Sequence, residues 1–383
     1  MRSLLTEYNI TQYNYKLLGN FLGFTQRNQK LLGTMAATKP LYRLHELSYR
    51  TQYAELKERA NAAGALLSGT PGTLYKRTGT GHEYWYRVYY PVPGKQAEEF
   101  VGQANDKVAY QAMSNRIAYT EWMAEQVANL RKLGYQVADK GVASVLVELH
   151  NRRLFEAGLI VVGTLAYMSW LNEYGAMAVA ARTQDVDLAR RQRLKLATSV
   201  SFLSSIEATH LPFTSIPRTP SHEPSTAVKL PGREGLRVDI LAPGPELGQT
   251  VQVAELEWHA QAIPHYDYML QDSQKAAMLA GGHCIPIMLP RVERMIWHKL
   301  YSSADRTRAA DKREKDIIQA VTLAAILVEQ DGASLIQSYS VAPDALKAAT
   351  LARLPRIHAL LERHPETRDA FGSLASTGLL SNP

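Results

Sequence analysis

Apolar residues recur at helical and strand spacings in the first part of the chain, and these spacings predict its elements. Apolar positions over 47–67, 106–134 and 141–157 follow the period of a helix that buries one face. Between the first two helices, residues 84–90 alternate on a period of two and are rich in tyrosine. Together with residues 72–77 and the Gly-Thr-Gly turn that separates the two segments, they predict a hairpin of aromatic strands.

A compact α/β pattern follows from residue 159 to about residue 256. It begins with an apolar strand that leads straight into a helix, and it contains a Pro-, Ser- and Thr-rich stretch over 211–226 that predicts an exposed loop. The last third of the chain reads mostly as helix, with segments over 293–301, 312–329 and 343–363 and a frayed tail after Pro365.

These elements predict an α+β fold in which a mixed sheet is flanked by helices. A chain of 383 residues is too long for one core of ordinary size, so two or three domains are expected. The pattern divides the chain into an extension, an N-terminal region of helices plus an aromatic β-hairpin, an α/β core and a mainly helical C-terminal domain. Their expected bounds are 1–44, 45–150, 151–260 and 261–383.

Composition and charge narrow the classes of function. With 46% hydrophobic and 21% charged residues, the chain can bury real cores and is not a disordered segment. The 43 Lys and Arg residues exceed the 36 Asp and Glu residues, which gives a net charge of +7 and a pI near 9.2. This basic excess suits a polyanionic partner such as RNA or a nucleotide, although solubility alone explains it equally well.

Cysteine content and hydropathy indicate a soluble protein of a reducing cytoplasm, with no membrane partner. Cys284 is the single cysteine, so an intrachain disulfide and the multi-cysteine zinc sites are excluded. Polar residues interrupt every apolar run before it reaches the length of a signal-peptide core or a membrane span. We expect the adjacent His283 and Cys284 to form a buried pair and not a zinc site, which needs more ligands.

The first candidate for chemistry is Gly163-Thr164, at the point where the apolar strand 159–162 runs into a helix. Backbone amides at a helix N-terminus have no partner within the helix, and they bind phosphate oxygens well. The threonine adds a hydroxyl at the same place. This junction therefore predicts a phosphate-binding turn.

The second candidate is a set of aspartates on two predicted strands. In the segment 185–188 a strand period places Asp185 and Asp187 on one face and the two apolar residues in the core. Asp239 lies in the same way on the strand 236–241. Adjacent carboxylates repel each other unless a cation lies between them, and Mg²⁺ prefers such oxygen ligands. Two exposed acidic residues at the end of a strand are, however, more often only solvated side chains without a role in metal binding.

The order of these motifs resembles the nucleotidyltransferase superfamily of the DNA polymerase beta type, and within it a bacterial group of nucleotidyltransferase-fold proteins. The resemblance runs from Gly163-Thr164 through the helix and the strand 183–188 to the later strand with Asp239. The flanking segments 84–86, 289–300 and 313–320 add to it, so it covers roughly residues 45–330. The superfamily usually has Gly-Gly or Gly-Ser where this chain has Gly-Thr.

The resemblance implies a role for particular residues. Asp185, Asp187 and Asp239 would form an acidic triad that binds metal, two Mg²⁺ ions or alternatively Mn²⁺, with Asp239 as a metal ligand or a proton acceptor. Gly163 and Thr164 would contact the nucleotide phosphates, and Thr183 would support the acidic strand. The remaining implied nucleotide-binding residues follow the core, and they are Lys299, Lys315 and Asp316, the last pairing with the lysines. Solvated charges on helix surfaces would explain these three equally well.

The reaction implied by the resemblance is the metal-dependent transfer of a nucleoside monophosphate from an NTP to a hydroxyl acceptor. RNA, tRNA in particular, is the favoured acceptor because the chain is basic and because its hairpin is aromatic. Trp85, Arg87 and Tyr89, with Lys76 and Arg77, could stack and hold single-stranded RNA, although cross-strand packing explains the aromatic residues as well. A toxin or defence role, with an antitoxin-like protein partner, follows from the same resemblance.

Two alternatives belong to other classes. The acceptor could be a protein side chain or a small molecule. The chain could also be a catalytically silent module that binds nucleotide or RNA. Three carboxylates would repel phosphate in the absence of metal, so an intact triad argues against the silent module.

Overall fold

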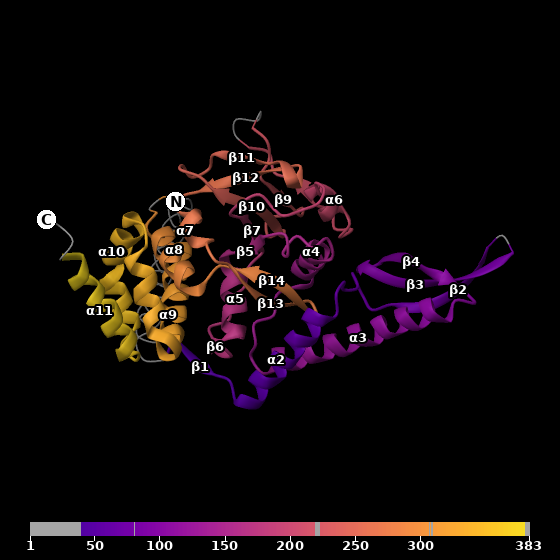
Figure 1. Cartoon of the computed structure of the whole chain (residues 1–383), viewed down its shortest axis with the longest axis horizontal. Coiled ribbons are helices and arrows are strands. Elements are labelled where there is room, and N and C mark those ends of the chain that lie inside the picture. Colours follow the sequence, from indigo (N-terminus) through magenta and orange to yellow (C-terminus); the bar gives the residue numbers. More distant parts are fainter. Residues whose placement is uncertain (1–39, 80, 219–222, 306, 308, 380–383) are drawn as a thin grey trace, which may run out of the picture.

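The computed structural model describes residues 40–379 except 80, 219–222, 306 and 308. Most of the predicted extension 1–44 lies outside the described residues. Its last residues form β1 (Tyr42–Leu44), which pairs antiparallel with β6 (Ala176–Ala178). The described chain mixes helices with a multi-stranded sheet, which confirms the expected α+β class (Figure 1).

The central sheet forms from the segment that the pattern singled out as the α/β core. Its strand order is β11-β12-β10-β7-β5, with β9 also paired to β10 and β8 paired to β9. The two strands that carry the aspartates are parallel neighbours, whereas β5 runs antiparallel to β7. The strands are β5 (Leu159–Val161), β7 (Asp185–Arg190), β8 (Thr214–Ser215), β9 (Ala227–Lys229), β10 (Arg237–Pro243), β11 (Thr250–Val253) and β12 (Trp258–Ile263).

Both faces of this sheet are covered by apolar side chains. On one face Val186, Leu188 and Val238 join the main hydrophobic core. On the other face Ala189 and Leu241 join a smaller cluster under α7 (Tyr266–Met269). Because strand residues alternate between faces, the second face is the one that carries the aspartates.

A β-hairpin lies in the region that the sequence assigned to a mainly helical domain. Strands β13 (Gln274–Ala280) and β14 (His283–Leu289) pair antiparallel through a two-residue turn. Both turn residues, Gly281 and Gly282, have positive φ, which tight hairpin turns require and which glycine adopts without strain. His283 and Cys284 are buried in β14, as expected of a buried pair.

The predicted aromatic hairpin forms a three-stranded sheet that projects from the body beside a long helix (Figure 1). We call this sheet and its helix the arm; its elements are β2 (Thr73–Gly79), β3 (His82–Val92), β4 (Lys95–Gln103) and α3 (Lys107–Lys132). Trp85 packs on Tyr110 of α3, with 4.8 Å between ring centroids. On the opposite face Phe100 is 59% exposed and contacts the rings of Tyr84 and Tyr86.

The structure of the arm corrects the expectation that Trp85, Arg87 and Tyr89 form an open face for RNA. Arg87 is buried rather than part of an open basic surface, and its guanidinium donates to the carbonyl oxygens of Ser68, Thr70 and Pro71. It also forms an ion pair of 2.7 Å with Glu99. Three backbone acceptors and one carboxylate satisfy a buried guanidinium fully, so Arg87 holds the base of the arm together.

Helices connect the arm to the sheet and complete the main core. The helix α2 (Leu47–Ala62) ends in the region expected from the sequence, and its buried Tyr53 donates to the carboxylate of Glu173. The other helices of this part are α4 (Lys140–Asn151), α5 (Gly163–Glu173) and α6 (Phe202–Glu207). α5 begins directly after β5, as the strand-to-helix pattern predicted.

The C-terminal helices lie on the side of the body away from the arm (Figure 1). They are α8 (Val292–Ala304), α9 (Ala310–Ser340), α10 (Asp344–Leu360) and α11 (Pro365–Leu379). The backbone of α9 is non-helical at Asp331, close to the predicted helix end at 329. The expectation of a frayed tail after Pro365 was wrong, because Phe371 and Leu374 of α11 are buried and hold the helix in place.

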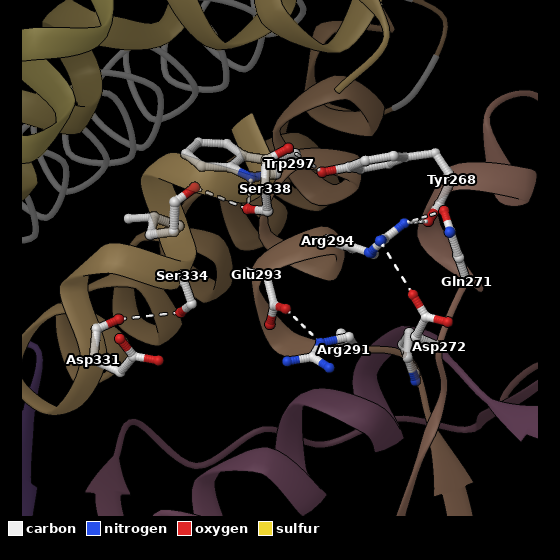
Figure 2. Close-up of polar contacts among 12 residues, drawn as sticks. Tyr268, Gln271, Asp272, Arg291, Glu293, Arg294, Trp297, Asp331, Ser334 and Ser338 are labelled. Carbon is white, nitrogen blue, oxygen red and sulfur yellow. Dashed lines mark hydrogen bonds and ion pairs between the residues drawn. The ribbon is translucent and has the colours of Figure 1, made fainter. Parts of the chain in front are cut away.

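A polar network fastens α7 to the C-terminal helices (Figure 2). Arg294 of α8 donates to the carbonyl oxygen of Tyr268 and to the side chain of Gln271. The hydroxyl of Tyr268 donates to the carbonyl oxygen of Ser338 in α9, whose own hydroxyl accepts from the indole of Trp297. Each buried polar group in this network has a partner, so α7, α8 and α9 are held in one fixed arrangement.

Candidate active site

Asp187 and Asp239 are direct neighbours on parallel strands. The register of β7 and β10 pairs Asp185 with Arg237, Val186 with Val238, and Asp187 with Asp239. The side chains of paired residues on adjacent strands point to the same face of a sheet. The structure therefore brings two carboxylates from segments 52 positions apart in the sequence to the same point of the sheet.

Gly163 lies against this pair. Its φ is +67°, and a Cβ atom added there would overlap the Oδ2 atom of Asp187 and lie 3.0 Å from Cγ. Only glycine has the left-handed backbone conformation at low cost and leaves room for the carboxylate. The amino end of α5 is thus held directly beside Asp187, with the half-buried Thr164 in its first turn.

Thr183 supports the start of β7. Its hydroxyl accepts a hydrogen bond of 3.0 Å from the backbone amide of Asp185. This contact fixes the backbone where the acidic strand begins, and it is the kind of support that the resemblance implied for this residue.

Arg237 is a member of the site that the sequence analysis missed. It makes two hydrogen bonds to Asp239, from Nε to Oδ2 at 2.6 Å and from a terminal nitrogen to Oδ1 at 2.5 Å. The signal was present in the sequence, because residues two apart on a strand lie on the same face. The paired guanidinium stabilises the ionised form of Asp239 within a mostly buried environment.

Burial and the neighbouring charges raise the pKa values of Asp187 and Asp239. Burial, and then the neighbouring carboxylates of Asp239 and Asp185, raise the pKa of Asp187 from its ordinary value of 3.8 to about 7. Burial also raises the pKa of Asp239, and the contact with Arg237 opposes that shift. The site therefore favours an additional positive charge near Asp187.

Lys299 and Lys315 belong to the electrostatic environment of the same site. Lys299 is buried, and its ammonium donates to Asp316 at 3.1 Å and to Gln319 at 2.7 Å, so the expected pairing with Asp316 is present. Its charge lowers the pKa of Asp187. Burial and the charge of Lys299 lower the pKa of Lys315, and Asp316, Asp185 and Asp187 oppose that shift. These lysines are therefore not solvated surface charges.

The donor atoms fit a hard divalent cation at Asp185 and Asp187. Carboxylate oxygens are the ligands that Mg²⁺ prefers, and a bound cation would offset the burial and the neighbouring carboxylates that disfavour the ionised form of Asp187. Within the described residues, no group of three or more His, Cys, Asp or Glu side chains is positioned to hold a metal ion. Asp239 instead holds Arg237, so the three carboxylates do not converge as a ligand set in this arrangement.

The fold and this site define a phosphoryl-group transferase built on a mixed sheet, with acidic residues on two parallel strands beside a helix N-terminus. The family model described as nucleotidyltransferase matches residues 140–343, which is more than half of the chain. The chain belongs to this nucleotidyltransferase family, and it is a transferase of phosphorus-containing groups. Searches of curated proteins and of solved structures gave no match.

The matched segment contains every residue of the candidate site. It begins at the start of α4 and ends before α10, so the arm and the last two helices lie outside it. None of the described helices combines the length and the apolar character needed to cross a membrane.

Proposed function

We propose that the chain transfers a nucleoside monophosphate from an NTP to a hydroxyl at the end of an RNA, with tRNA as the favoured acceptor. The observation that supports the chemistry best is the pairing of Asp187 with Asp239 beside the amino end of α5. In the reaction the acceptor oxygen forms a bond to the α-phosphorus. The bond between that phosphorus and the α–β bridging oxygen breaks, and pyrophosphate leaves with the bonding electrons.

The triphosphate would bind between the amino end of α5 and the buried lysines. The amides of Gly163 and Thr164 are at the helix N-terminus, where partial positive charge favours phosphate oxygens. Lys299 and Lys315 would neutralise charge that builds up on the leaving pyrophosphate. Asp316 and Gln319 hold Lys299 in place for this role.

The acceptor proton would pass to Asp239. This carboxylate is buried, its pKa is raised, and Arg237 fixes its orientation with two hydrogen bonds. A carboxylate with a raised pKa is a stronger base than an ordinary one, which suits removal of a proton from a hydroxyl group. Asp185 and Asp187 would hold Mg²⁺, or alternatively Mn²⁺. Bound there, the ion supplies a Lewis acid for the phosphate oxygens and lowers the pKa of the acceptor hydroxyl.

The arm supports RNA over a small acceptor. It projects from the body, and on its open face Phe100 contacts Tyr84 and Tyr86 while Arg77 lies over the Tyr86 ring at 5.4 Å (Figure 1). Exposed aromatic rings bind unpaired bases by stacking. A net charge of +7 adds attraction for a polyanion. We propose that the acceptor strand lies along this face.

A cellular role follows from the same proposal. Blocking the ends of tRNA would stop translation, so the enzyme would act as a toxin or a defence factor in the cytoplasm. An antitoxin-like protein would restrain it. Co-purification of the tagged full-length chain from its own host would identify such a partner, and growth that is unaffected by its uncontrolled expression would argue against the toxin role.

Incubation of the protein with each labelled NTP, Mg²⁺ and total tRNA tests the reaction. Label on RNA that is lost in Asp185→Asn and Asp187→Asn is the expected result. Asp344→Asn is the matched control, because this aspartate side chain is fully exposed and lies outside the site. Label on protein or on a small molecule would redirect the proposal to another acceptor. Nucleotide binding without transfer to any acceptor would contradict it and favour a silent module.

A further inference from the structure

A concave site lies at the other end of β7 and β10 from the aspartates. It is a cavity of about 720 Å³ at the carboxyl ends of β7 and β10, lined by Arg190 and Arg191 at the end of one strand and by Pro243 and its neighbours at the end of the other. Asp187 precedes Arg191 by four residues, which along a strand is about 13 Å. Between the two ends of the sheet, α7 covers the face that carries the aspartates. The cavity is therefore separate from the candidate active site.

One part of the cavity wall offers positive charge. The Nε atom of Arg191 donates to the carbonyl oxygen of Asp267 at 3.0 Å. Among the described residues this is the one protein acceptor that its guanidinium meets, so both terminal nitrogens remain available to a ligand. Arg190, by contrast, is engaged with Glu255 and with the carbonyl oxygen of Gln252. Arg191 is the group that can bind an anion with two parallel hydrogen bonds.

Another part of the wall carries aromatic and proline rings. The ring of His265 packs edge-on against Tyr301, with 4.9 Å between centroids and an angle of 89°. Burial lowers the pKa of His265, so this imidazole is neutral near pH 7. Four prolines complete the wall; they are Pro243, Pro245, Pro264 and Pro343. Proline has no N–H to leave unpaired, and its ring presents CH groups to a flat aromatic ligand.

The wall is also held rigidly before any ligand binds. Tyr268 lines the cavity, and Figure 2 shows it fixed between the carbonyl oxygen of Ser338 and the guanidinium of Arg294. His298 faces the same segment, and its Nε2 atom donates to the carbonyl oxygen of Pro264, 3.1 Å away. A preformed site loses little entropy when it binds its ligand.

We propose that this cavity binds a nucleoside monophosphate. The phosphate would bind the terminal nitrogens of Arg191, and the base would lie against Tyr301, His265 and the prolines. The exposed carboxylate of Asp267 at the rim would accept hydrogen bonds from ribose hydroxyls. The volume falls within the range of about 300–1,000 Å³ that small-molecule sites occupy. The inference does not depend on the acceptor proposed above, because none of these groups belongs to the candidate active site.

Calorimetric titration of the full chain with AMP tests the proposal. The buffer contains EDTA, which keeps divalent metal away from the aspartates. The expected result is that Arg191→Gln weakens AMP binding about tenfold or more, because a charged hydrogen-bond pair is lost. Arg193→Gln is the matched control, an exposed arginine two residues away that does not line the cavity, and it should bind AMP like the wild type.

Further measurements distinguish binding in this cavity from binding at the candidate active site. Asp187→Asn should retain AMP binding, whereas adenosine and inorganic phosphate alone should each bind more weakly than AMP. In the wild type, AMP should slow amide hydrogen exchange around His265, a measurement that needs no variant to fold. The proposal is overturned by wild-type affinity in a folded Arg191→Gln, by loss of binding in Asp187→Asn alone, or by no binding at millimolar AMP.

Discussion

The carboxylate of Asp187 occupies the space that a side chain at Gly163 would need. This relationship joins the first residue of α5 to the acidic strand, so neither can move without the other. It also explains why α5 must begin with glycine.

Gly163→Ala should reduce nucleotidyl transfer by about a hundredfold, because the new methyl group displaces the Asp187 carboxylate by on the order of an ångström. It should also lower the free energy of unfolding by about 1 kcal/mol or more, since alanine at φ +67° is strained. Steady-state kinetics and urea unfolding measure the two effects. Gly372→Ala is the control, because its added Cβ meets no atom within 4 Å, and it should leave transfer unchanged. Full activity of Gly163→Ala would contradict the described contact.

Asp187 predicts how the stability of the metal-free protein changes with pH. Its pKa is about 7 in the folded chain and near 3.8 in the unfolded chain, so the folded state binds the extra proton between these values. The contribution of Asp187 to stability therefore falls as the pH rises from about 4 to 7 and levels off above that range. In EDTA, Asp187→Asn should be more stable than the wild type at pH 8, by on the order of 3 kcal/mol. The difference should vanish near pH 4.

Chemical unfolding at pH 4, 6 and 8 measures this difference. Asp344→Asn should differ only slightly from the wild type at every pH, because its carboxylate is fully exposed and its pair with Lys347 is long, at 3.8 Å. Millimolar Mg²⁺ at pH 8 should raise the Tm of the wild type and leave that of Asp187→Asn unchanged, since bound cation supplies the missing positive charge. An equal stability difference at pH 4 and pH 8 would show that the carboxylate does not titrate as described.

Arg237→Gln should destabilise the protein by about 1–3 kcal/mol, because it leaves the buried Asp239 carboxylate without its two hydrogen bonds. The value is moderate because 40% of the Arg237 side chain is exposed to solvent. Loss of the guanidinium should raise the pKa of Asp239 further, so the acid limb of the pH–rate profile should move to higher pH. Arg233→Gln, an exposed arginine on the preceding turn, should change neither property. An unshifted acid limb would rule out Asp239 as the proton acceptor.

The two faces of the arm should respond differently to substitution. Phe100→Ala should weaken RNA binding about fivefold or more, because it removes a stacking surface, while NTP binding in the absence of RNA stays the same. Arg87→Ala should unfold the arm, since three carbonyl oxygens lose their buried donor. Filter binding and limited proteolysis distinguish these effects. Unchanged RNA affinity in Phe100→Ala would remove the arm from the acceptor site.

The core was predictable because its information is local. The alternation around Asp185 and Asp187 and around Asp239 predicted two strands and the face of each aspartate, and the structure places Val186, Leu188 and Val238 in the core as expected. The pairing of Asp187 with Asp239 could not be predicted, because the register between two strands depends on the whole sheet. A local pattern does not specify it.

The features that the sequence analysis missed depend on contacts between distant segments. The open face of the arm is decided by α3, which covers Trp85, and the two faces of β3 are similarly aromatic in sequence. α11 is ordered because Phe371 and Leu374 pack into the core, although a terminal segment ordinarily frays. The hairpin of β13 and β14 is an exception, because its signal is local: Gly281-Gly282 lies between two apolar runs.

That hairpin also sets the order in which a growing chain can fold. β14 packs against α2, α3 and α4, and the amide of Cys284 donates to the sulfur of Met123 in α3. The amide of Ala138 donates to the carbonyl oxygen of Leu279, and that of Gly281 donates to the carbonyl oxygen of Ala138. The first helices therefore leave the ribosome well before the strands that bury them. Until about residue 290 has emerged, their apolar faces depend on chaperones or on one another for protection from aggregation.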